Sequence, residues 1–173
     1  PKVSGERQER DLAWLLKKWP SGYQTAFRKS VLTDILQQQY TDYPGFDYHD
    51  VLFGMLAPLY GKVVCLDQLL DQHRIHQANV TQSASSLSFN KTRLSRINYL
   101  QKVISRYESV KKIAEERQIS EADHRQVTRA LALTNLRLKL LQSRNPFWAL
   151  GLMFQIREYR TIKDFISDLV YTY

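Results

Sequence analysis

The residues best suited to metal binding lie together in the stretch DQLLDQHRIHQ. His73 and His76 are three positions apart and would share one helical face, with Asp67 and Asp71 about one turn earlier. Imidazole and carboxylate groups placed in this way can bind zinc or a di-metal centre. No HExxH or ExxH motif and no second cysteine accompanies them. Because a zinc site needs three or four converging ligands, we interpret the stretch as a solvated helix face, and we expect no metal site and no cofactor.

The residue types used in covalent or acid–base catalysis occur here without the neighbours that would activate them. Cys65 is the only cysteine and stands among apolar residues, where a thiol behaves as a small apolar side chain rather than a nucleophile. The serines of residues 83–88 lack a Gly-x-Ser-x-Gly elbow, and no glycine-rich phosphate loop is present. The carboxylate pairs at 115–116 and 121–123 fall at expected helix ends, where dipole and solvent account for them. We therefore predict no catalytic residues and no enzymatic activity.

Positive charge is concentrated in one part of the chain. The net charge is +8, and residues 91–144 hold 13 Lys and Arg against 5 Asp and Glu, so they contain the whole excess. An ordered row of cations can neutralise successive phosphates of a nucleic acid and release counterions. Arginine also grips phosphate with two parallel donors. We predict a basic surface that contacts a nucleic acid backbone without sequence preference, formed by Lys91, Arg93, Arg96, Lys102, Arg106, Arg117, Arg125 and Arg129.

Other binding functions fit the same sequence. The apolar residues 147–154 and the 10 tyrosines could form a protein–protein interface, as in an adaptor or oligomerisation module, and an acidic protein could take the place of nucleic acid. An anionic membrane surface would also attract the cations. The basic residues could instead form a solvated surface with no dedicated partner. Salt-dependent affinity would favour the nucleic acid, whereas self-association would favour the assembly module.

The composition is typical of one soluble α-helical domain. The chain has 173 residues, of which 43% are hydrophobic and 24% charged, and its 6 glycines and 5 prolines are few for an all-β protein. No apolar run approaches the roughly 20 residues of a membrane span. A single cysteine suits a reducing compartment, so we expect a cytoplasmic location. The chain begins at Pro1, which is compatible with an excised domain that has lost a targeting segment.

The element expected at the centre of the fold is a helix near residues 121–143. Val127, Leu131, Leu138 and Leu141 recur at helical spacing, and further leucines form a second apolar row. A helix with two apolar rows lies inside a core. Residues 136–140 also alternate at the strand period, but leucine favours a helix over a strand. The sequence therefore predicts an all-α bundle of about six helices around this one.

The remaining helices are bounded by capping and breaking residues. We expect helices at 6–19, 21–40 and from 47, the last kinked near Pro58 and resuming to about 75, followed by one at 90–118. Ser120 with Asp123, and Thr161 with Asp164, have the spacing of N-terminal caps. Three further features complete the organisation: Asn145-Pro146 starts a helix, residues 147–156 are apolar nearly all round and should be buried, and the polar loop 81–88 could separate an N-terminal layer, 1–80, from a C-terminal bundle, 89–173.

Overall fold

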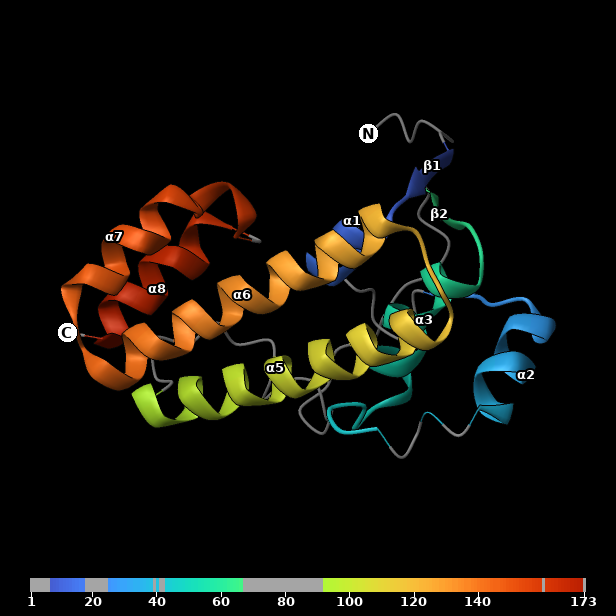
Figure 1. Cartoon of the computed structure of the whole chain (residues 1–173), viewed down its shortest axis with the longest axis horizontal. Coiled ribbons are helices and arrows are strands. Elements are labelled where there is room, and N and C mark those ends of the chain that lie inside the picture. Colours follow the sequence, from blue (N-terminus) through green and yellow to red (C-terminus); the bar gives the residue numbers. More distant parts are fainter. Residues whose placement is uncertain are drawn as a thin grey trace, which may run out of the picture.

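The computed structural model describes residues 7–17, 25–38, 40, 43–66, 92–159 and 161–172, and these residues are mostly helical (Figure 1). The all-α, multi-helix prediction is confirmed. In chain order the elements are β1 (Arg7–Arg10), α1 (Leu12–Lys17), α2 (Lys29–Gln37), α3 (His49–Tyr60), β2 (Val63–Leu66), α5 (Arg93–Glu116), α6 (Glu121–Ser143), α7 (Pro146–Phe154), the 3-10 turn η3 (Ile156–Glu158) and α8 (Ile162–Thr172).

Helix α6 is the central element, as the sequence predicts. It runs beside α5 as the second arm of a long hairpin and also contacts α1, α7 and α8 (Figure 1). Leu140 and Leu141 are fully buried, and Leu133 is 6% exposed. The Ser120 side chain accepts a hydrogen bond from the backbone N–H of Asp123, which satisfies one of the free amides at the helix start.

Two apolar clusters meet along α6. The larger joins α1, α3, α5 and the N-terminal half of α6, and includes Met55, Leu56, Val110 and Val127. The smaller joins the C-terminal half of α6 to α7 and α8, through side chains that include Leu140, Leu152 and Phe165. The short C-terminal helices therefore pack mainly against α6, and α8 also contacts α5.

The sequence did not predict the two strands. Residues 7–10 were expected to be helical, but they pair antiparallel with Val63–Leu66, so that Arg7 faces Leu66 and Arg10 faces Val63. The helix predicted to resume after Pro58 is wrong for residues 61–66, because α3 ends at Tyr60 and a strand follows, and the rest of that prediction, to about residue 75, lies outside the described residues. The β-branched Val63 and Val64 favour an extended strand, and Pro58 in the last turn of α3 cannot donate a backbone hydrogen bond.

The starts of the last two helices follow their sequence signals. Asn145 Oδ1 accepts from the backbone N–H of Phe147 at 3.0 Å, and Pro146 occupies the first turn of α7. Thr161 Oγ1 accepts from the backbone N–H of Asp164 at 3.2 Å at the start of α8. These caps depend only on residues within one turn of each other, so they can be read from the sequence alone.

Replacing Gly151 with alanine is expected to stabilise the protein. A Cβ at this position would lie 3.5 Å from Leu136 Cδ2, which is ordinary van der Waals contact. Alanine is preferred over glycine inside a helix by about 1 kcal/mol, so the free energy of unfolding should rise by roughly 0.5–1 kcal/mol. Urea denaturation followed by circular dichroism measures the change. A loss of stability would mean that α7 cannot approach Leu136 as closely as the structure has it.

Candidate interaction surface

The structure uses several of the predicted basic residues inside the fold. Arg106 is buried, and its Nε donates to the carbonyl oxygen of Gly45 at 2.9 Å. Burial lowers the pKa of the Arg106 guanidinium. Arg93 donates from Nε to the carbonyl of Leu141 at 2.6 Å and from Nη2 to that of Gln142 at 2.9 Å, so it satisfies the C-terminal end of α6. The prediction that Arg106 projects outward is therefore wrong, because distant carbonyl groups bind these arginines.

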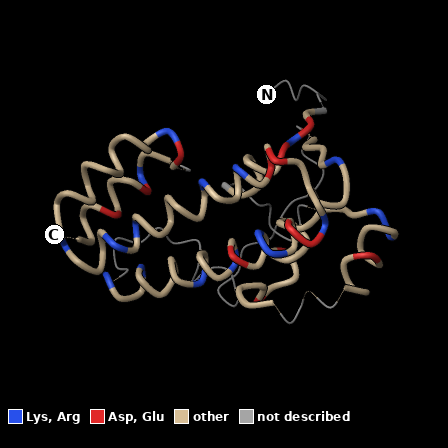
Figure 2. The backbone as a smooth tube through the Cα atoms, in the orientation of Figure 1, with Lys and Arg blue, Asp and Glu red and all other residues tan. Residues whose placement is uncertain are grey.

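The other predicted cations that the structure describes have separate surroundings. Lys102 pairs with Asp47 at 3.2 Å, Arg125 with Glu121 at 3.3 Å, and the Arg117 guanidinium lies 3.6 Å from the centre of the Tyr60 ring. Arg129 is exposed and lines a cavity between α1, α5 and α6, and Lys91 lies outside the described residues. Lysine and arginine positions are spread along both long helices, with acidic positions between them (Figure 2).

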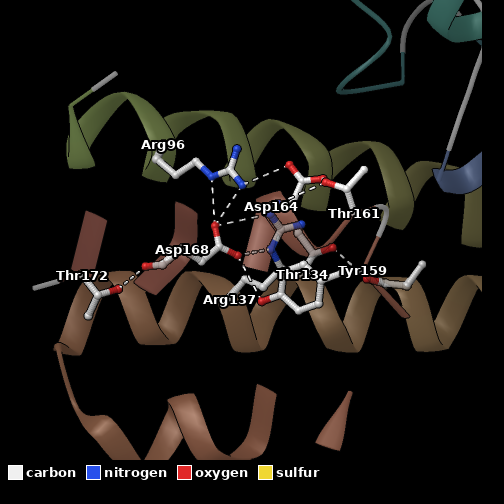
Figure 3. A network of polar contacts seen from close by, with 9 residues as sticks. Arg96, Thr134, Arg137, Tyr159, Thr161, Asp164, Asp168 and Thr172 are labelled. Atoms are coloured by element: carbon white, nitrogen blue, oxygen red, sulfur yellow. Dashed lines mark hydrogen bonds and ion pairs between the residues drawn. The ribbon is translucent and has the colours of Figure 1, made fainter. Parts of the chain in front are cut away.

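The most heavily bonded polar group in the C-terminal part is the carboxylate of Asp168, which has no exposed surface. It links three elements (Figure 3): Oδ1 accepts from Arg96 Nε of α5 at 3.0 Å, and Oδ2 accepts from Arg137 Nε of α6 at 2.6 Å. The hydroxyl of Tyr159 also donates to Oδ2, at 3.1 Å. We call Arg96, Arg137, Tyr159 and Asp168 the Asp168 network.

Charges in the Asp168 network stabilise one another. Burial alone would lower the pKa of Arg137, but the adjoining Asp168 carboxylate offsets it and raises that pKa above its ordinary value. Burial, followed by the nearby carboxylate, raises the pKa of the Tyr159 hydroxyl, so this group stays protonated and keeps donating. Both carboxylate oxygens are fully occupied, which suits a structural link rather than a general base. One feature of the sequence could have indicated this network: the charged Asp168 lies between the apolar Phe165 and Leu169 on the side of α8 that faces the core.

Helix α7 is exposed along most of its length, so the prediction that residues 147–156 are buried is wrong. Phe154 is 91% exposed and Phe147 75%, and only Leu152 is fully buried. The cause is the number of neighbours: among the described elements α7 packs mainly against α6 and the following turn, which cover one side of it. The sequence of α7, PFWALGLMF, contains no charged residue.

An exposed apolar row also runs along α8. Ile162, Ile166 and Val170 are four residues apart, so they lie on one helical face, opposite the buried Phe165 and Asp168. Eight of the fourteen large apolar side chains that are exposed in the described residues fall within residues 147–170. Their concentration contrasts with the scattered apolar residues that are normal on a protein surface. We define the apolar surface as Phe147, Leu150, Met153, Phe154, Ile156, Ile162, Ile166 and Val170.

The candidates for catalysis or metal binding gain no support from the structure. The serines of 83–88 and the residues Asp67, Asp71, His73 and His76 lie outside the described residues. Within the described ranges, no three His, Cys, Asp or Glu side chains are grouped as metal ligands would be. Cys65 is half-buried in β2. The carboxylate pairs at 115–116 and 121–123 are used in surface contacts, such as Glu115 with His124 at 3.2 Å.

Comparison with known proteins does not identify a relative. No protein family, curated protein or solved structure matches the chain. No helix among the described residues is long and apolar enough to span a membrane. Within the described residues, the apolar surface is the feature that packing leaves unexplained.

Proposed function

We propose that this chain is a non-catalytic helical module that binds another protein through the apolar surface on α7, η3 and α8. The exposure of α7 carries the proposal, because a nine-residue helix without a charge that shows two phenylalanines to solvent is unfavourable in isolation. The cytoplasmic location expected from the single cysteine is compatible with such a module and belongs to the same proposal.

The exposed apolar side chains of α7, η3 and α8 can contribute binding free energy to a complex. Burying a fully exposed side chain such as Phe, Leu or Ile is worth about 1.5–3 kcal/mol. Exposed cations beside the surface, Arg144, Arg157 and Lys163, favour a partner with acidic residues around its apolar contacts.

The nucleic acid alternative retains fewer supporting residues. Arg93, Arg96 and Arg106 are occupied by contacts within the fold, which leaves Lys102, Arg117, Arg125 and Arg129 as the described cations of the predicted set that could reach phosphate. Isolated cations that each contact a single phosphate bind nucleic acid weakly and do not fix its orientation. An anionic membrane would meet the same apolar surface and is distinguished by the experiment below.

The experiment is site-specific photocrosslinking in cells that produce the protein naturally. A benzophenone amino acid at Phe154 or Ile166 should give one discrete protein adduct, whereas the same group at Leu94 should not, although Leu94 is 66% exposed on α5. Adducts to lipid or nucleic acid alone, or equal adducts from Leu94, would contradict the proposal. Adducts to a second copy of the chain would identify the module as self-associating.

Replacing Phe147 and Phe154 together with serine is expected to weaken binding of the crosslinked partner at least a hundredfold. Both side chains are largely exposed, so the fold should be retained, and each loses about 1.5–3 kcal/mol of apolar burial in the complex. Titration calorimetry with the purified partner measures the effect. Leu94→Ser is the matched control and should bind like the wild type. If the double variant binds normally, α7 is not the binding surface.

A further inference from the structure

A partly open cavity of about 320 Å³ lies between α1, α5, α6, η3 and the start of α8. Its apolar walls include Leu16 of α1, Val103 of α5, and Ala130 and Leu133 of α6. The volume is at the lower end of the range for small-molecule sites, which is about 300–1,000 Å³. Apolar walls combined with a few polar and charged groups are the usual form of such a site.

The polar groups of the cavity carry both signs of charge. Arg129 of α6 is exposed and has no ion pair with any residue the structure describes. Glu158 of η3 and Asp164 of α8 also line the cavity and supply two carboxylates. Asp164 keeps spare acceptor capacity: Oδ2 accepts from Thr161 Oγ1 at 2.9 Å, and Oδ1 is 3.7 Å from Arg96 Nη2. A second cation, Arg137, is already hydrogen-bonded to Asp168.

The aromatic part of the wall is formed by Tyr99, Tyr107 and Tyr159. Two of their hydroxyls are used within the fold, since Tyr107 donates to the carbonyl of Leu16 at 2.8 Å and Tyr159 donates to Asp168. These rings therefore offer mainly apolar surface to the cavity. Gln126 adds one acceptor, because its buried Oε1 has no hydrogen-bond partner in the part of the chain that the structure describes.

We infer that this cavity binds a zwitterionic small molecule of the α-amino-acid class with an aromatic or large apolar side chain. The ligand carboxylate meets the Arg129 guanidinium, which can hold it with two parallel hydrogen bonds. The ammonium group meets Asp164 and Glu158, and the side chain fills the apolar floor beside the tyrosines. A nucleotide or other polyanion is disfavoured by the two carboxylates, and a purely apolar ligand would leave Arg129 without a partner. This site is separate from the apolar surface, so it does not rest on the proposed protein-binding function.

Isothermal titration calorimetry of the full chain with L-phenylalanine and L-tryptophan tests the inference. Saturable binding of at least one is expected, at least about tenfold tighter than phenethylamine, which lacks the carboxylate, and 3-phenylpropionate, which lacks the ammonium group. No binding of either amino acid, or equal binding of the compounds that lack one charge, would overturn it.

Three variants locate the binding. Arg129→Gln changes an exposed side chain and should weaken binding at least about tenfold. Arg125→Gln, one turn earlier and paired with Glu121, is the matched control and should bind normally. Ala130→Leu fills the floor of the cavity and should abolish binding, with folding checked by circular dichroism. Binding that survives both Arg129→Gln and Ala130→Leu would show that the cavity is not the site.

Discussion

Replacing Asp168 with asparagine is expected to lower the free energy of unfolding by about 3–5 kcal/mol. The carboxylate has no exposed surface, and its loss leaves the Arg137 guanidinium in the interior without its ion-pair partner and leaves Arg96 with only the longer contact to Asp164, at 3.7 Å. Removing one partner from a buried ion network costs much more than the network itself contributes, because the remaining charges stay desolvated. Domains of this size are stable by only about 5–15 kcal/mol, so the variant should lie close to unfolding.

Urea denaturation followed by circular dichroism measures this loss, and two further variants interpret it. Asp164→Asn removes a carboxylate from the same helix, but this side chain is 23% exposed and 3.7 Å from Arg96, so it should cost about 1 kcal/mol or less. Replacing Arg96 and Arg137 with methionine and Asp168 with leucine together should recover most of the stability, because no buried charge is then left unpaired. If Asp168→Asn costs no more than Asp164→Asn, the network does not fix α8.

The Asp168 network also connects stability to the proposed function. It fixes the rotation of α8 about its own axis, because Asp168 faces α5 and α6 while Ile162, Ile166 and Val170 face outward. The buried ion pairs thus determine which side chains of α8 belong to the apolar surface. Buried charge of this kind is weak evidence for stability, and its best-attested use is to select one packing arrangement over others.

What the sequence predicts well is local. The caps at Ser120, Asn145 and Thr161 and the bounds of α6 depend on residues within a few turns, where spacing and side-chain chemistry decide the outcome. The strands were missed because Arg7–Arg10 has no apolar alternation, and its conformation depends on pairing with residues more than fifty positions away. Residues 7–10 therefore carry no local signal of the strand that they form.

The basic residues and α7 show that local sequence patterns are also insufficient to predict which residues lie on the surface of the protein. Spacing assigned Arg106 to the side of α5 away from its apolar stripe and placed Arg96 near the start of the helix. Their partners, the Gly45 carbonyl and Asp168, are 61 and 72 residues away in the chain. The composition of α7 indicated burial, but burial depends on how many elements surround a helix, which composition does not specify. Both differences between expectation and structure bear on the proposed binding surface, which lies on the C-terminal helices rather than on α5.

Replacing Gly45 with alanine is expected to destabilise the protein by about 2–5 kcal/mol, as the sum of backbone strain and overpacking. Gly45 has φ of 93°, a conformation that side chains disfavour. A Cβ here would lie 2.7 Å from both the backbone N and Cα of Arg106, and α5 cannot withdraw its backbone locally. The segment would have to move away, breaking the hydrogen bonds from Arg106 Nε to the Gly45 carbonyl and from Ser109 Oγ to the Pro44 carbonyl.

Gly61→Ala is the matched control for this prediction, because its φ of 169° is extended and no atom lies within 4 Å of the added Cβ. Its unfolding free energy should stay within about 0.5 kcal/mol of the wild type. Urea denaturation of the two variants then tests whether residues 43–47 pack against α5. If Gly45→Ala were as mild as Gly61→Ala, Arg106 would not be held beneath this segment and could face solvent, which would restore the basic row on α5 that nucleic acid binding requires.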